Sequence, residues 1–344
     1  MKALQVTRNA RPSEALEIVD LPIPEPGPGQ VRVEVSAASL NFNDIDRCYG
    51  RVTTIPMPPP FTLGMDVCGT VEASGEGAEA WLGKRVVAIT QMAQGGIAQY
   101  AIAPVDSVFE APPELDDAEA AAFMIPYHTT HLALFERAAL KKNEGVLVIS
   151  GASGLGTAAI QLAKARGARV FATAGGPTKV ALCRKLGADI TIDHRETNFA
   201  DAVLDYSQDV GAEVVLDLAG GSFVADAWRA VARGGRYVAL GFADDPENGT
   251  GGVALRPTCI GNFSIVGVIG AYMSNLPSAL RRSGFNPFGR DVAEAVHADL
   301  LSLIATGDLR PHVGQRVSME DAGKALEAHE HRESLGRTSI EIGA

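Results

Sequence analysis

The 344-residue sequence has few cysteines, no basic runs and no long apolar segment. Its four cysteines are far apart and form no Cys-x-x-Cys pair, which excludes a disulfide-stapled miniprotein and indicates buried thiols in a reducing compartment. The N-terminus lacks a signal-peptide pattern and no stretch of about 18 uncharged apolar residues occurs, so we expect a cytoplasmic protein that does not enter the membrane. A net charge of −11 without Lys/Arg clusters argues against a nucleic-acid binder.

The first hundred residues contain short apolar runs that are separated by turn-forming residues. This spacing predicts a small, mostly β, barrel-like domain. The runs are residues 2–7, 31–37, 67–73, 85–89 and 98–103.

From about residue 145 the pattern changes to short β-branched runs that alternate with helical stretches. Strands separated by helices of that length indicate βαβ units in a parallel sheet, and six strands make a complete doubly wound domain. A helix is expected near residues 291–305, and the strand-helix-strand tail after it should pack back onto the first domain. The predicted strands are residues 146–150, 169–174, 189–192, 214–218, 237–241 and 265–269.

A glycine-rich turn follows the first of these strands. Gly151-Ala152-Ser153-Gly154-Leu155-Gly156 matches the dinucleotide fingerprint, with Ser153 at the middle glycine position. In that fingerprint the first glycine makes the tight turn, the second lets the backbone approach the diphosphate closely, and the third lets helix and strand pack closely. The strand before it, the helix after it and the βα repeats that follow favour a cofactor site over an ordinary turn.

The end of the second predicted strand bears on which nicotinamide cofactor is bound. NAD-binding versions carry a carboxylate there for the ribose 2′-hydroxyl, whereas this chain has Gly175-Gly176 and then Lys179. With no acid at that position to repel a 2′-phosphate, and with His194 or Arg195 as further donors, NADPH is favoured over NADH. The alternative is that Lys179 is only a solvated helix residue.

Several segments together resemble the medium-chain dehydrogenase/reductase superfamily, specifically its zinc-independent quinone oxidoreductase (zeta-crystallin-like) branch. The resemblance implies a mixed α/β fold: a GroES-like β-barrel catalytic domain formed by residues 1–124 and 273–344, and a doubly wound Rossmann domain over residues 125–272. It rests on the glycine turn and on residues 38–44, 63–71, 126–129, 181–189, 217–221, 234–236 and 241–243.

The ligand positions of zinc-dependent members are altered in this sequence. Asn41 stands at the expected cysteine, and the Gly-His-Glu motif is Gly64-Met65-Asp66. A catalytic zinc needs about three protein ligands, so we expect no metal. His128 and His131 share a helix face, where packing or lining a pocket is the simpler role.

The resemblance also implies roles for individual residues. Asn41 and Asp44 would border the nicotinamide and the substrate, although Asp44 is equally suited to a helix N-cap or a structural hydrogen bond. The proton donor stays open among Tyr49, Tyr127, His128 and water. The implied cofactor-binding residues are Thr129, Gly151, Ser153, Gly154, Leu155, Gly156, Gly175, Lys179, His194, Gly241, Phe242, Val266, Val268 and Arg337.

The expected activity is metal-free hydride transfer from NADPH to a quinone, because an acceptor that spreads the added charge needs no metal. One alternative is an NADPH-dependent enone or enoyl-thioester reductase, and a non-enzymatic one is an NADPH-binding redox sensor. The resemblance implies a homodimer through the last Rossmann strand, residues 264–271, against the alternative of an edge covered by its own loops. Residues 274–290 either close over the substrate or simply connect two elements.

Overall fold

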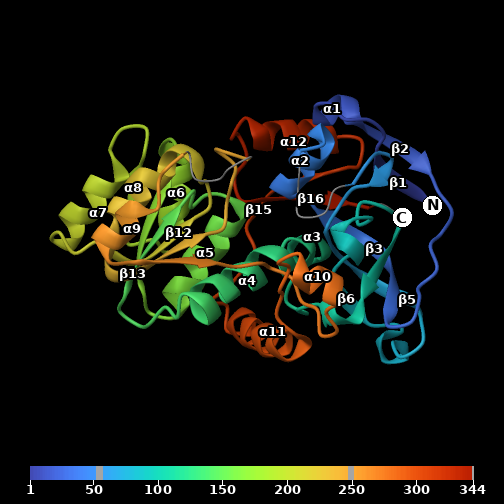
Figure 1. The fold of residues 1–344 in the computed structure, drawn as a ribbon. Coiled ribbons are helices and arrows are strands. Elements are labelled where there is room, and N and C mark those ends of the chain that lie inside the picture. Colours follow the sequence, from blue (N-terminus) through green and yellow to red (C-terminus); the bar gives the residue numbers. More distant parts are fainter. Residues whose placement is uncertain (52–56, 247–251, 343–344) are drawn as a thin grey trace. The chain divides into compact units, whose positions relative to one another are not determined.

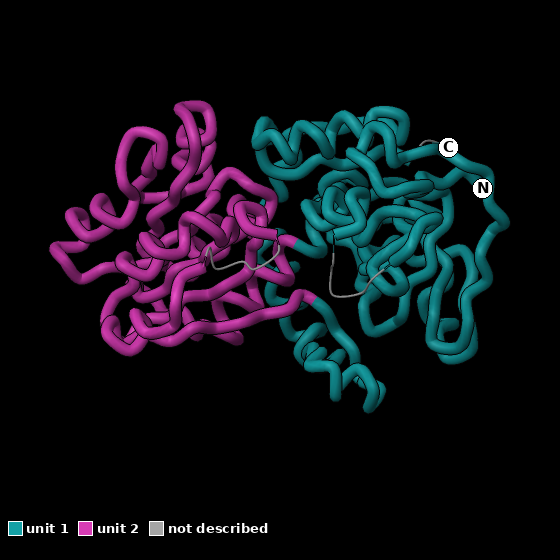
Figure 2. Tube along the Cα trace, turned by 45° about the horizontal axis from the view of Figure 1, so that its top comes forward, with its two compact units in different colours: residues 1–125, 271–305, 310–344 teal, residues 126–270, 306–309 magenta. Residues whose placement is uncertain are grey.

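The computed structural model describes residues 1–51, 57–246 and 252–342. The chain divides into two compact units: unit 1 comprises residues 1–125, 271–305 and 310–344, and unit 2 comprises residues 126–270 and 306–309 (Figure 2). Within the described ranges, no helix is long and apolar enough to cross a membrane.

Unit 1 is built around mostly antiparallel strands, with helices between them (Figure 1). Both chain termini belong to this unit. Its elements are β1 (Lys2–Val6), α1 (Pro12–Ala15), β2 (Leu16–Asp20), β3 (Gln30–Ser39), α2 (Phe42–Tyr49), β4 (Phe61–Thr62), β5 (Asp66–Ser74), η1 (Glu79–Trp81), β6 (Arg85–Ile89), η2 (Gln91–Ala93), β7 (Tyr100–Pro104), η3 (Val105–Ser107), β8 (Val108–Glu110), α3 (Asp117–Ala121), α10 (Ser278–Arg282), α11 (Arg290–Ala305), β15 (Val313–Val317), α12 (Ala322–Glu330) and β16 (Arg337–Glu341).

The long strand β3 organises the main sheet of unit 1. It pairs antiparallel with β5, β7 and β16, so the C-terminal strand completes a sheet begun about 300 residues earlier in the chain. Alternation along β3 buries Val31, Val33 and Val35, as expected for a strand with one face on a core. A separate three-stranded sheet has the order β2-β1-β4.

Unit 2 alternates strands and helices along the chain. The helix α4 (Met124–His131) enters it and continues as a π-helical segment, η4 (Leu132–Arg137). The elements that follow are β9 (Gly145–Ile149), α5 (Gly154–Ala165), β10 (Arg169–Ala174), α6 (Pro177–Lys185), β11 (Ile190–Asp193), α7 (Phe199–Ser207), β12 (Ala212–Asp217), η5 (Gly221–Phe223), α8 (Val224–Arg229), β13 (Val231–Ala239), α9 (Arg256–Gly261) and β14 (Ser264–Gly267).

The six strands of unit 2 form one parallel sheet in the order β11-β10-β9-β12-β13-β14. The strand β9 is wholly buried, and its Val146 pairs with Val170 on one side and Val214 on the other. The chain order reverses at this strand, so the carboxyl ends of β9 and β12 form the switch point where doubly wound sheets bind ligands. This arrangement confirms the expected mixed α/β fold class.

The start of one strand and the burial of one cysteine differ from the sequence-based expectations. The strand β13 begins at Val231 and continues through Gly234-Gly235, with an irregular register against β12, whereas the sequence pattern indicated a start at residue 237. The expectation of buried thiols is wrong for Cys259, which is exposed at α9, whereas Cys48, Cys68 and Cys183 are buried. A lone cysteine in an apolar stretch does not reveal which face of its helix it occupies.

Candidate active site

The glycine turn of unit 2 lies at the switch point and leaves no room for a side chain at Gly151 or Gly156. Ser150 follows β9 with a φ of 62°, which places the chain in the left-handed region. A Cβ on Gly151 would lie 2.9 Å from the sulfur of Cys183, and one on Gly156 would lie 2.3 Å from the carbonyl oxygen of Ser150. Packing therefore favours glycine at both positions, and at Gly156 this is the close helix–strand packing that the fingerprint predicts.

Ser153 caps the helix that the turn begins. Its hydroxyl oxygen accepts the Gly156 N–H at 3.1 Å, which is the usual N-cap arrangement. Gly154 and Leu155 form the first turn of α5 and are partly exposed. The N-terminus of α5 lies at the carboxyl edge of a parallel sheet, and the glycines around it carry no side chain that could cover its backbone N–H groups. Such a helix start suits the diphosphate of a dinucleotide.

Basic side chains surround the glycines at the end of β10. A Cβ on Gly175 would lie 2.9 Å from Nε of Arg195 and 3.2 Å from Nε2 of His194, so both side chains lie against this glycine. Lys179 is in the first turn of α6. The same place holds a carboxylate that sequence reasoning missed: Asp193 accepts the Gly176 N–H. Its position beside His194, at the end of the third strand, was the available signal.

The predicted nicotinamide-side residues of unit 2 occupy separate loops and a helix. A Cβ on Gly270 would lie 2.0 Å from Oγ1 of Thr129, so this buried threonine packs directly over the backbone beyond β14. Gly241 is equally confined, because its Cβ would meet the Leu218 carbonyl oxygen at 2.0 Å. The neighbouring Phe242 is 52% exposed. Val266 is buried in β14, and Val268 follows the strand.

Unit 1 contains a buried polar cluster where α2 begins. Asn41 donates through Nδ2 to Asp66 at 2.8 Å and accepts at Oδ1 from Arg337 at 3.0 Å. Arg337 also pairs with Asp66 at 3.1 Å and donates to the Ser39 hydroxyl. The backbone N–H of Asn41 donates to Asp44 at 2.8 Å. The structure thus joins three predicted residues, Asn41, Asp44 and Arg337, with Asp66.

Burial raises the pKa values of the two carboxyl groups in this cluster. Desolvation raises the pKa of Asp66 to about 6, although Arg337 and the Asn41 amide favour the carboxylate. Desolvation also raises the pKa of the fully buried Asp44, against the attraction of Arg47, which lies 3.8 Å from its Oδ1. Asp44 therefore acts as an internal hydrogen-bond acceptor for the start of α2, one of the two roles weighed for it.

The raised pKa of Asp66 gives a testable pH dependence. A carboxyl whose pKa is higher in the folded than in the unfolded chain takes up its proton first in the fold, so its contribution to stability grows as the pH falls from about 6 towards 4. A shift of this size corresponds to at most about 3 kcal/mol. We expect the stability advantage of the wild type over Asp66→Asn, measured by urea unfolding, to be larger at pH 4.5 than at pH 7.5. If the wild type were more stable than Asp66→Asn by the same amount at both pH values, the raised pKa of Asp66 would be contradicted.

Two of the candidate proton donors, Tyr49 and Tyr127, are hydrogen-bonded to other side chains of the protein. The Tyr49 hydroxyl donates to Glu330 on α12 at 3.0 Å, and burial together with that carboxylate raises its pKa. Tyr127 is 1% exposed, and its hydroxyl accepts a hydrogen bond from Gln161 at 2.9 Å. His128 is likewise buried. The Tyr49 hydroxyl is thus bound to Glu330 and the Tyr127 hydroxyl to Gln161, and a catalytic role for either tyrosine stays a prediction.

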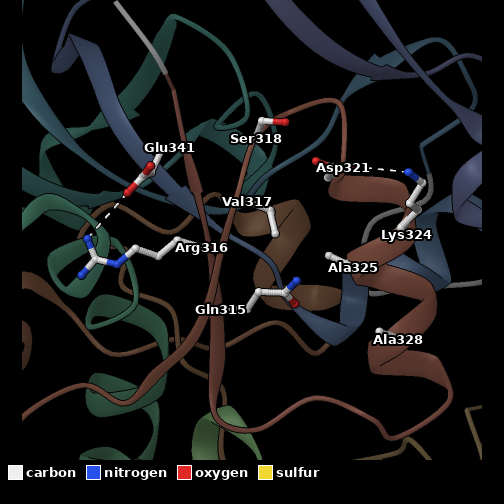
Figure 3. A pocket seen from close by; sticks show the side chains of 9 residues that line it. All are labelled: Gln315, Arg316, Val317, Ser318, Asp321, Lys324, Ala325, Ala328 and Glu341. Atoms are coloured by element: carbon white, nitrogen blue, oxygen red, sulfur yellow. Dashed lines mark hydrogen bonds and ion pairs between the residues drawn. The ribbon is translucent and has the colours of Figure 1, made fainter.

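A surface hollow of about 410 Å³ in unit 1 contains none of the predicted site residues. Its charges are matched in pairs, since Arg316 lies 3.6 Å from Glu341 and Lys324 lies 3.4 Å from Asp321 (Figure 3). The lining comes from β15, β16, α12 and the turn before that helix: Gln315, Arg316, Val317, Ser318, Asp321, Lys324, Ala325, Ala328 and Glu341.

The donor groups around Asn41 do not form a metal site. Asn41 and Met65 replace two ligand types expected in zinc-dependent relatives, and the Asn41 amide is engaged by Asp66 and Arg337. Over the described ranges of the chain, no group of three or more His, Cys, Asp or Glu side chains is arranged to hold a metal ion.

Comparison with known proteins matches both units. Residues 27–113 fit the alcohol dehydrogenase GroES-like domain, and residues 154–283 fit the zinc-binding dehydrogenase family. The chain is 33% identical to the quinone oxidoreductase of Sus scrofa over 291 residues, covering 84% of this chain and 81% of that protein. It is 25% identical to the Escherichia coli quinone oxidoreductase complexed with NADPH, with a TM-score of 0.84 over 99% of this chain and all of that one.

A second solved structure agrees with these matches. The quinone oxidoreductase of Thermus thermophilus, also solved with NADPH, is 31% identical, with a TM-score of 0.79 over 99% of this chain and all of that one. The fold and these matches define an oxidoreductase built from a GroES-like and a Rossmann unit. More particularly, the chain belongs to the zinc-independent quinone oxidoreductase branch of the medium-chain dehydrogenase/reductase superfamily.

Proposed function

We propose that this enzyme transfers a hydride from NADPH to a quinone without a metal ion. The observation that carries the proposal is the nucleotide half-site of unit 2, where a glycine turn at the switch point is accompanied by basic side chains around Gly175. The glycines leave space for a diphosphate, and the basic side chains suit a 2′-phosphate, so the residues present fit NADPH. When bound, NADPH supplies the hydride.

The chain's own residues hold and orient the reactants. In this proposal the N-terminus of α5 binds the diphosphate, and Lys179 and His194 bind the adenosine phosphate. Thr129 orients the nicotinamide carboxamide. Asn41, whose amide is held in place by Asp66 and Arg337, borders the nicotinamide and the substrate. The residues proposed to contact the cofactor are Thr129, Gly151, Ser153, Gly154, Leu155, Gly156, Gly175, Lys179, His194, Gly241, Phe242, Val266, Val268 and Arg337.

The state of the candidate acids favours a quinone as acceptor. The Tyr49 hydroxyl donates its hydrogen bond to Glu330, and the buried Tyr127 hydroxyl is bound by Gln161. An enone or enoyl thioester needs a proton at carbon, which a positioned acid normally delivers. A reduced quinone carries its charge on oxygen and exchanges protons with water, so it requires no such group.

The test compares initial rates of NADPH and NADH oxidation with a small quinone and a matched enone. We expect the quinone and NADPH to be preferred. Lys179→Ala should lower kcat/KM for NADPH about 10- to 100-fold, because a hydrogen bond to a charged group contributes about 1.5–3 kcal/mol. It should lower kcat/KM for NADH less than threefold.

Lys185→Ala is the matched control, because this lysine is at the other end of the same helix and should leave both rates unchanged. Preference for the enone would instead establish the enoyl-reductase alternative. Cofactor binding without turnover on either acceptor would favour the redox-sensor alternative.

We also propose a homodimer that works in a reducing compartment such as the cytoplasm. The strand β14 is at the edge of its sheet and exposes Ile265, and the preceding helix exposes Ile260. Exposed apolar side chains beside an unpaired strand edge suit isologous pairing. The four free cysteines suit a compartment that keeps thiols reduced.

A further inference from the structure

The helix α6 begins without the capping groups that helices normally carry. Its N-cap, Gly176, has no side chain to accept an N–H, and its first turn contains no acidic residue. That turn instead contains the cation Lys179, which is unfavourable beside the positive end of a helix. A helix start of this kind is stabilised by an anion that comes from elsewhere in the chain.

Asp193 supplies this anion from the end of β11. Its two carboxylate oxygens each lie 3.1 Å from the Gly176 nitrogen, and Oδ1 also accepts the Arg195 N–H at 3.0 Å. These two amide donors hold the pKa of Asp193 below its usual range. The carboxylate is therefore ionised at neutral pH and tied to the turn that starts α6.

This charge is located inside the basic cluster described above. Arg195 and His194 both contact Gly175, the residue that directly precedes Gly176. The cluster thus combines the cations Arg195 and Lys179 with one fixed carboxylate. That carboxylate already uses the helix-terminal N–H that a phosphate would otherwise accept.

We propose that Asp193 is a specificity-determining residue that limits how strongly the enzyme discriminates NADPH from NADH. The inference rests on the proposed NADPH site. The carboxylate repels the 2′-phosphate of NADPH and competes with it for the Gly176 N–H, whereas the neutral 2′-hydroxyl of NADH can donate a hydrogen bond to a carboxylate. The basic side chains set the preference for NADPH, and Asp193 reduces it.

The test is Asp193→Asn, which keeps the side-chain size and one carbonyl acceptor for Gly176 but removes the charge. Dissociation constants of NADPH and NADH are measured by calorimetry at low and high salt. We expect the dissociation constant of NADH divided by that of NADPH to rise at least about fivefold, mainly because NADPH binds more tightly. The increase should shrink at high salt, because exposed charges are screened.

Asp205→Asn is the matched control, since it removes an exposed carboxylate of α7 in the same unit and should not change the ratio. Asp193→Glu keeps the charge and should stay close to the wild type. If Asp193→Asn does not fold, Asp193→Ser provides an uncharged acceptor, and the same rise is expected.

Two failures are distinguishable. Wild-type protein that binds neither nucleotide would refute the proposed function itself. Wild-type protein that binds NADPH, together with an unchanged or lower ratio in the folded uncharged variant, would overturn only the role of Asp193.

Discussion

Replacing Gly156 with alanine is expected to weaken NADPH binding at least 100-fold. The added Cβ would lie 2.3 Å from the Ser150 carbonyl oxygen and 2.7 Å from Cα of Gly151, and both atoms belong to the backbone. A backbone contact cannot be relieved by rotating a side chain, so the start of α5 must move away from β9. A displacement of about 1 Å is enough to cost a factor of about 100 at a positioned site.

The measurement is a calorimetric titration of the variant with NADPH, accompanied by thermal unfolding to confirm that it is folded. Gly27→Ala is the matched control, because its Cβ would meet only the flexible end of Gln30, at 3.3 Å. Affinity within threefold of the wild type in a folded Gly156→Ala protein would show that the turn does not bind the diphosphate.

Replacing Arg337 with methionine is expected to cost about 3–5 kcal/mol of unfolding free energy at neutral pH, because it leaves Asp66 buried without its cation. The side chains of this pair are only 6% and 0% exposed. The loss should be smaller at pH 5, where the raised pKa of Asp66 lets the carboxyl become neutral. Asn41 also loses the donor that fixes its amide, so kcat should fall as well.

Arg316→Met provides the comparison. This arginine pairs with Asp116 at 2.6 Å, but both side chains are nearly half-exposed, and such pairs contribute at most about 1 kcal/mol. Urea unfolding of both variants measures the difference. An Arg337→Met protein that loses no more stability than Arg316→Met would contradict the importance of the buried cluster.

Much of the fold could be predicted because burial makes apolar residues recur at regular intervals along helices and strands. The predicted strand 169–174 coincides with β10, and the predicted helix 291–305 differs from α11 by one residue. Strands that lie in the sheet interior on both faces give continuous apolar runs, as β9 does. The pattern of β2 is mostly exposed, so its sequence carries little signal and the strand was missed.

The candidate site was less predictable because its contacts are distant in the chain. Glycines mark positions where a Cβ would clash with neighbouring atoms, as it would at Gly151 and Gly156. The pairing of Arg337 with Asp66 spans 271 residues and leaves no local pattern. Arg337 was predicted from the resemblance to approach the cofactor, and the structure shows its guanidinium bound within unit 1.

The activity proposed for this enzyme is the reduction of a quinone by NADPH without a metal ion. The most direct measurement is the initial rate of NADPH oxidation with a small quinone, recorded before and after exhaustive chelation, with the metal content measured on the same samples. We predict the same rate in both samples. The proposed activity would be contradicted by a rate that disappears on chelation and returns with zinc, or by metal-free protein that binds NADPH but reduces no quinone.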